Sequence, residues 1–334
     1  MMPRWRPGQA FALVPLVAVW LSACGGTAGG PDAGQGPVWL DAPMAPFPET
    51  LSEVGVFPDM ADPMRADARA VPYAPAFPLW SNGSRKLRHV VLPGPIDDRT
   101  ASWRFPPGTV FFKTFFFGED LSEPVETRIM RLDDDGWDYA VYAWAGDEAT
   151  RTDGRSHPVD VETPAGALEH EIPGRLACRG CLESSPSWIL GFRELQLNHM
   201  AEGRDRLELE RFADRLESGL PDPADAIEHS DAETRTVLGY LEGNCVACHN
   251  GTTDGPNSTY DLSHRVALTN LIDQPAMSSG TIAGTRVIPG DPDASVLILS
   301  MRGQTDADPM PPIGVQRIDS EMIDRIGRWI ADLE

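Results

Sequence analysis

The sequence predicts a multidomain α+β protein, in which a β-rich domain that forms a sandwich or barrel precedes an all-α domain. Between residues 38 and 175, short apolar runs alternate with turn residues, a pattern typical of strands. The last hundred residues begin and end with segments of helical periodicity. At 334 residues, the chain also exceeds the length that one hydrophobic core usually serves.

Four runs in the first region have the length and composition of strands. Residues 125–132 and 137–144 flank an acidic turn that contains Gly136, so this stretch predicts a β-hairpin. The runs 86–92 and 109–117 precede it. We expect the phenylalanines of 109–117 to fill a core rather than to form a ligand surface, because aromatic strands in cores are far commoner.

Helical periodicity appears in the last third of the chain. Residues 231–241 and 320–333 each place apolar side chains on one face, as helices do. Leucines among charges before the Gly219-Leu220-Pro221 sequence indicate helix-like segments that connect the two regions. The predicted divisions are a β-rich domain with a C-x-x-C sequence over 38–190, a helical connector over 191–229 and the all-α domain over 230–334.

The N-terminus has the build of a secretory signal, with a basic start, an apolar run over 11–21 and small residues before Cys24. Leu21-Ser22-Ala23-Cys24 resembles the bacterial lipoprotein box, which implies removal of a signal peptide over 1–23 and lipidation of Cys24. An ordinary signal peptide or a membrane-spanning anchor are the alternatives, although the run is short for a span. With a glycine-rich tether over 24–37, we expect an exported lipoprotein anchored to a membrane and facing the periplasm or cell surface.

The formal net charge of −22 argues against nucleic acid as a partner. An acidic surface could attract a basic docking partner, but it is also common in exported proteins, where it supports solubility. The charge therefore identifies no particular partner.

The strongest motif is Cys245-Val246-Ala247-Cys248-His249, a C-x-x-C-H sequence. In this motif two thiols add to the vinyl groups of haem, and the adjacent imidazole becomes the proximal iron ligand. With 5 Cys and 7 His in the chain, composition alone would produce it about 0.0016 times. A thioredoxin-like pair would lie near a βαβ pattern, and a zinc site would need two further clustered ligands. The sequence thus predicts one covalent haem c on Cys245 and Cys248, with His249 as proximal ligand.

A second iron ligand is expected downstream of His249. Met310 offers a thioether in the proline-rich stretch 308–314, just before the final predicted helix. This placement resembles class I c-type cytochromes and implies that Met310 is the second axial ligand. The other candidates lack this context; they are His264, Met277 and Met301.

The same resemblance to class I cytochromes implies that the all-α domain has a cytochrome c-like fold. In that fold, Gly239 and Tyr240 on the entry helix would pack against Trp329 on the exit helix.

Beyond this part, the chain from residue 51 onward resembles a family of exported bacterial di-haem c-type cytochromes of unassigned role. The stretches that carry the resemblance are Phe-Pro-Leu-Trp-Ser-Asn-Gly over 77–83, Trp-Arg-Phe-Pro-Pro-Gly-Thr over 103–109, Val-Glu-Thr-Arg over 125–128, and 190–198, which contains Leu-Gly-Phe and Leu-Gln-Leu-Asn.

The first haem motif of that family is degenerate in this chain. It corresponds to Cys178-Arg179-Gly180-Cys181-Leu182, where a leucine occupies the ligand position. Leucine cannot coordinate iron, so one haem is expected instead of two. Cys178 and Cys181 would form a disulfide, remain free thiols, or hold a haem through another ligand such as His170 or His199.

Together these features predict a lipid-anchored c-type cytochrome that exchanges single electrons with an unidentified redox partner protein. One alternative is an oxidoreductase subunit whose β domain binds a substrate, but the sequence has no G-x-G-x-x-G after a strand, no H-E-x-x-H and no G-x-S-x-G. Another is a haem-based sensor, which a sixth ligand at Met310 would oppose. We therefore expect an electron carrier without a catalytic site of its own.

Overall fold

The structure is a computed structural model that describes residues 38–118, 121, 123–183, 189–201, 207–252, 260–276, 283–312 and 314–334. The predicted signal peptide, lipidated Cys24 and tether lie outside the described residues. Residues 38–334 form one compact unit.

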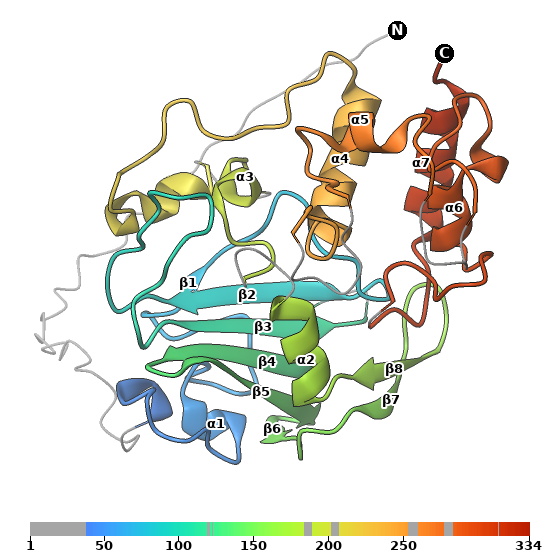
Figure 1. The fold of residues 1–334 in the computed structure, drawn as a ribbon. Helices are drawn as coiled ribbons and strands as arrows, with labels where there is room; N and C mark the ends of the chain where they lie inside the picture. Colours follow the sequence, from blue (N-terminus) through green and yellow to red (C-terminus); the bar gives the residue numbers. More distant parts are fainter. Residues whose placement is uncertain are drawn as a thin grey trace, which may run out of the picture. The chain divides into compact units, whose positions relative to one another are not determined.

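A six-stranded antiparallel sheet occupies the first half of this unit (Figure 1). Its strands are neighbours in sequence order, β1 to β6, so each pair is joined directly. A separate two-stranded sheet, β7–β8, follows. The bounds are β1 Val71–Pro72, β2 Arg85–Val91, β3 Val110–Phe116, β4 Pro124–Asp133, β5 Gly136–Ala145, β6 Glu148–Arg151, β7 His157–Val161 and β8 Leu168–Ile172.

The four predicted strands are confirmed as β2 to β5, each within one residue of its expected ends. The predicted hairpin is β4–β5, in which Asp133 pairs with Gly136. Gly136 has a φ of 122°, a conformation that a residue without a Cβ adopts at little cost. The phenylalanines of β3 are buried, as expected. In the described chain the sheet ends at β1 and β6 without closing, so it is not a barrel.

The helices are short and are concentrated in the second half. The predicted helices at 231–241 and 320–333 are confirmed as α4 and α7. Asp231 and Asp319 cap them by accepting hydrogen bonds from Thr234 N–H and Met322 N–H. The bounds are η1 Trp39–Asp41, α1 Leu51–Val54, α2 Arg175–Glu183, α3 Glu194–Leu197, η2 Leu209–Arg215, α4 Ala232–Asn244, α5 Ala267–Leu271, η3 Pro292–Ala294, α6 Val296–Met301 and α7 Ser320–Ala331.

The predicted fold class is wrong in its second part, because the described residues contain no all-α cytochrome c-like domain. Between α4 and α7 the described helices are α5 and α6, of five and six residues, and the three-residue η3, and the other described residues there lie outside helices. The helical segments also pack against the loop before β2, since a Cβ added at Gly239 or Gly243 would meet Phe77 within 2.5 Å. Periodicity identified the two longer helices correctly, but it carried no information on the irregular chain between them.

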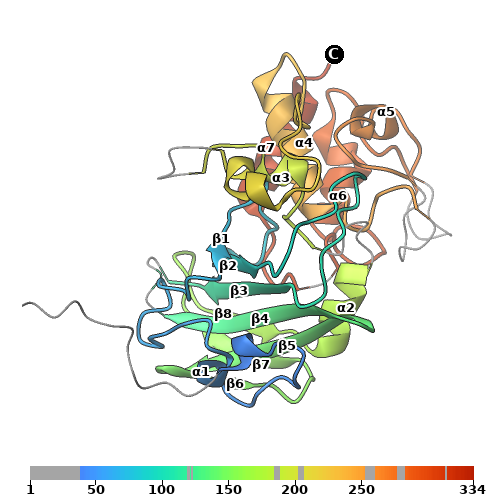
Figure 2. The same cartoon turned by 90° about the vertical axis from the view of Figure 1, so that its left-hand side faces the viewer.

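Different elements cover the two faces of the sheet (Figure 2). On one face, Phe112 and Ile129 pack with Leu51 and Val54 of α1. On the other, apolar strand residues such as Phe111 pack against α3, η2 and the segment before α3. The helices α4 to α7 lie on this second side, which is therefore the side that bears the C-x-x-C-H motif.

Candidate functional site

The C-x-x-C-H motif forms a helical turn directly after α4. Cys245 N–H donates to the Leu241 carbonyl at 2.8 Å, and His249 N–H donates to the Cys245 carbonyl, also at 2.8 Å. Residues three and four apart lie on the same side of a helical turn. The structure therefore brings both thiols and the imidazole of the predicted site together.

The surroundings favour the uncharged forms of all three side chains. Burial raises the pKa of the Cys245 thiol to about 12, and it also raises the pKa of Cys248. Burial, together with the charge of Arg286, lowers the pKa of His249. A neutral imidazole is the form that coordinates a metal.

The imidazole of His249 makes ring contact but no described hydrogen bond. Its ring centroid lies 4.8 Å from that of Tyr260, and the Arg286 guanidinium lies 3.9 Å from the Tyr260 centroid. His249 Nδ1 is buried without a hydrogen-bond partner. A buried polar atom of this kind is unfavourable unless a ligand or a further donor engages the ring.

An apolar cavity of about 140 Å³ lies between the motif and the sheet. It is reached by both C-x-x-C segments, although they are far apart in the chain. No local pattern in the sequence predicted that these two segments would meet. The residues that matter here are Ala247 and Cys248 of the intact motif, Pro311 and Pro312 after Met310, and Cys178 and Leu182 of the degenerate motif.

The degenerate motif lies on α2. Cys178 is buried there and packs with Val141 of β5 and Ile172 of β8. Leu182 is half-buried and lines the cavity at the position where the intact motif has its histidine. The side chain of Cys181 lies outside the described residues, so the alternatives for this pair of cysteines stay predictions.

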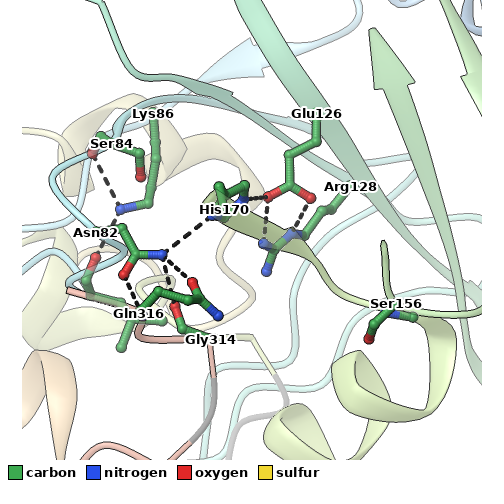
Figure 3. Close-up of polar contacts among 11 residues, drawn as sticks. Asn82, Ser84, Lys86, Glu126, Arg128, Ser156, His170, Gly314 and Gln316 are labelled. Atoms are coloured by element: carbon green, nitrogen blue, oxygen red, sulfur yellow. Dashed lines mark hydrogen bonds and ion pairs between the residues drawn. The ribbon is translucent and has the colours of Figure 1, made fainter. Parts of the chain in front are cut away.

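A buried hydrogen-bond network joins the sheet to the loop that precedes α7 (Figure 3). The Asn82 side-chain oxygen accepts hydrogen bonds from Gln316 N–H and Arg317 N–H, at 2.8 and 3.0 Å. This fixes the amide orientation, so Asn82 Nδ2 donates toward His170 Nδ1 at 3.2 Å. His170 then carries its proton on Nε2 and donates it to Glu126 at 3.1 Å.

Glu126 is completely buried at the far end of this network. Burial alone would raise the pKa of its carboxyl, but the charge of Arg128 and the hydrogen bonds from His170 and Arg128 hold the pKa below its ordinary value. Arg128 binds it through two nitrogens, at 2.9 and 2.5 Å. Because both His170 nitrogens are occupied, this residue is not available as the substitute iron ligand that the sequence suggested.

The segment 77–83 positions the motif through backbone and side-chain contacts. Trp80 N–H donates to Asn244 Oδ1 at 2.7 Å, one residue before Cys245. Trp80 Nε1 donates to the Arg317 carbonyl at 2.8 Å. Gly239 faces Phe77, while the predicted packing of α4 on α7 is present, since Tyr240 packs against the core cluster that contains Trp329 and Trp329 Nε1 donates to Thr234 Oγ1 at 3.0 Å. The loop before β2 therefore holds both the helix that leads into the motif and the chain that follows Met310.

Met310 is half-buried, and its N–H donates to the Ser300 carbonyl at 3.0 Å. The described hydrogen bonds and ring contacts of His249 do not include Met310. Among the other candidate ligands, Met301 is buried in the helical core. Met277 lies outside the described residues.

The two remaining histidine candidates have structural partners. His264 donates its backbone N–H to Glu242 and shares a 2.6 Å contact with the same carboxylate through Nδ1. His199 Nε2 lies 2.9 Å from the Ala74 carbonyl. Both side chains therefore tie loops to their neighbours in the fold.

Three residues of the site escaped the sequence analysis as functional positions: Asn82, Glu126 and Trp80. Asn82 and Trp80 belong to the 77–83 stretch, and Glu126 belongs to 125–128, which were noted only for their resemblance. The sequence signal that could have marked Glu126 as a buried functional residue is a carboxylate placed among the apolar residues of a predicted strand. Its partners could not be inferred, because they lie on other elements.

Comparisons of the chain with protein-family models, with curated proteins and with solved structures found no match. Within the described ranges, no group of three or more His, Cys, Asp and Glu side chains could hold a metal ion. No helix among the residues that the structure describes is long and apolar enough to span a membrane.

Proposed function

We propose that this chain is a c-type cytochrome that carries one covalently attached haem and exchanges single electrons with a partner protein. The observation that carries the proposal is the single helical turn that holds the Cys245 and Cys248 thiols beside the His249 imidazole. No other residue types at this spacing are needed for covalent haem attachment.

The residues present fit such a group. Burial lowers the pKa of His249, which favours the neutral imidazole that coordinates a metal, and its Nδ1 is buried without a hydrogen-bond partner among the described residues. Cys245 and Cys248 would attach the group, and His249 and Met310 are the residues proposed to hold its iron. When bound, haem supplies the one-electron chemistry of its iron.

Trp80 and Asn82 would act by positioning the helical turn 245–249 and the chain after Met310. Trp80 holds the end of α4 through Asn244, and Asn82 holds the chain after Met310 through Gln316 and Arg317. The loop 77–83 therefore contacts both the chain just before the Cys245–His249 turn and the chain just after Met310, the two segments that would supply the iron ligands. Partners of this kind orient metal ligands and tune the metal.

Haem attachment is tested by producing the full chain in a host that matures c-type cytochromes. Intact mass and the pyridine haemochrome spectrum count the haems per chain. We expect one haem, its loss in the Cys245→Ala variant, and its retention in the matched Cys178→Ala variant. A chain without haem would refute the proposal, and two haems would refute the single site.

Met310 ligation is tested by carbon monoxide binding to the reduced protein at neutral pH. An occupied sixth position resists carbon monoxide, so the wild type should bind it poorly and Met310→Ala readily. Met64→Ala is the control, because Met64 is exposed. Ready binding by the wild type would exclude Met310 as a stable ligand.

We further propose that the chain is exported and held at a membrane by lipid on Cys24, facing the periplasm or the cell surface. Multiple acyl chains anchor a protein firmly, whereas one chain does so only marginally. Mass spectrometry of the mature N-terminus should find a lipidated Cys24, and Cys24→Ser should release the protein from the membrane fraction. An unmodified N-terminus upstream of Cys24 would contradict this.

A further inference from the structure

A row of basic residues crosses the sheet on the face that bears the motif. Arg88 on β2 is the cross-strand partner of Lys113 on β3, and Lys113 is the partner of Arg128 on β4. Like charges directly opposite one another destabilise a sheet. Glu126 forms an ion pair with Arg128 at one end of this row. The charge of Arg88 at the other end is not balanced by this pair.

Arg88 is a buried cation that forms no ion pair with any residue the structure describes. Only 7% of the residue is exposed. Its Nε is buried without a hydrogen-bond partner, and in the described part of the chain its guanidinium forms no hydrogen bond, ion pair or ring contact. Burial lowers the pKa of this guanidinium, yet arginine remains protonated in proteins. A charge buried in this way is strongly unfavourable unless an anion joins it.

Arg88 and Lys113 line a cavity of about 230 Å³ between the sheet and the motif. Val246 and Ala247, the two residues between the motif cysteines, form part of the opposite wall. A single water needs roughly 10–15 Å³ of such space. The cavity therefore has room for a small ion together with several waters.

The acidic residues that line this cavity are engaged elsewhere. Glu242 is held by Arg193 and by the ring and backbone of His264. Asp261 accepts a hydrogen bond from Ser263 N–H. Neither carboxylate forms a described ion pair with Arg88, and the uncharged side chains of Ser102, Gln196 and Asn250 add polar atoms to the wall.

We propose that this cavity binds a small oxyanion, either phosphate or the carboxylate of a small organic acid, through Arg88 and Lys113. A guanidinium can donate two parallel hydrogen bonds to either group, and such charge-assisted bonds are about twice as strong as neutral ones. An ammonium beside it adds a point charge. Arg88 and Lys113 lie on β2 and β3, so anion binding would use neither the Cys245 and Cys248 thiols nor the His249 imidazole.

The proposal is tested by isothermal titration calorimetry on the purified full chain, in chloride buffer at constant ionic strength. Phosphate and succinate are titrated separately, so that the two sources of oxyanion are distinguished. We expect saturable binding of at least one of them at a single site, weakened at least tenfold in Arg88→Met. Arg155→Met is the control for net charge, because the Arg155 side chain is 88% exposed. No saturable binding of either anion, or equal weakening in both variants, would overturn the site.

Thermal unfolding gives a second readout that does not depend on the Arg88 variant being well folded. A ligand that binds only the folded state raises its melting temperature. The bound anion should raise the melting temperature of the wild type and of Arg155→Met, and have much less effect on Lys113→Gln. A wild-type melting temperature that is the same in chloride and in both oxyanions would overturn the proposal.

Discussion

The helix that leads into the C-x-x-C-H turn lies very close to the backbone at Phe77, and Gly243 makes this possible. A Cβ at position 243 would lie 2.5 Å from the Phe77 carbonyl oxygen and 3.0 Å from its carbon. Gly243→Ala gains about 1 kcal/mol of helix propensity, but overpacking typically costs about 1–3 kcal/mol. Because the backbone atoms of Phe77 cannot move aside as the tip of a side chain can, we expect an overpacking cost of about 3 kcal/mol, at the upper end of this range. The free energy of unfolding should therefore fall by about 2 kcal/mol.

Gly327→Ala is the matched control in α7, a helix of similar length. The nearest atom to a Cβ there is Pro292 Cβ at 3.9 Å, an ordinary contact. This variant should gain about 1 kcal/mol from helix propensity. Guanidinium unfolding followed by far-UV circular dichroism measures both variants and should separate them by about 3 kcal/mol. If the two agree within about 0.5 kcal/mol, α4 is not held against Phe77 as described.

Three further predictions concern charged residues. Glu126→Gln should lower the free energy of unfolding by about 3 kcal/mol at neutral pH, because it removes the buried carboxylate charge that pairs with Arg128. Since the pKa of Glu126 is lowered in the folded state, its contribution is present above the ordinary carboxyl pKa and is lost as pH falls through the lowered one. Urea unfolding from pH 7 to pH 3 should thus show a steeper loss for the wild type than for the variant; equal slopes would contradict this. Asp231→Ala removes the N-cap of α4 and should cost about 1 kcal/mol in the same assay, and no loss would show that the cap is dispensable. Arg325→Gln breaks a half-exposed pair with Glu233, so its effect should stay below about 1 kcal/mol, and a larger loss would show that the pair ties α7 to α4 more strongly than its exposure indicates.

Local patterns predicted the regular elements well. Strands β2 to β5 follow from short apolar runs between turn residues, and the β4–β5 turn follows from its glycine. The helices α4 and α7 follow from the periodicity of their apolar residues, and the structure adds the aspartate caps Asp231 and Asp319. The prediction of an all-α domain was wrong because it depended on how residues 245–319 fold. That stretch has little periodicity in its sequence, and its described residues contain few regular elements.

The candidate site was predictable only where its residues are close in sequence. Cys245, Cys248 and His249 lie within one turn, so spacing alone identified them. Glu126 and His170 are separated by 44 residues, and Asn82 and Gln316 by 234. Contacts of this kind arise from strand pairing and loop placement, which no local pattern encodes. Arg88 is a similar case, because a polar residue on a strand is normally expected to face water.

The meeting of the two C-x-x-C segments in one cavity follows from their separate attachments to the same sheet. Cys178 is delivered by α2, which follows β8 and packs on β5 through Val141. Cys248 is delivered by α4, which is held by the loop that leads into β2. Because Leu182 follows the second cysteine of its C-x-x-C where His249 follows Cys248, α2 contributes an apolar wall and not a second imidazole to this cavity. His249 is then the one imidazole at the end of the two C-x-x-C segments, which is the physical basis for proposing one haem.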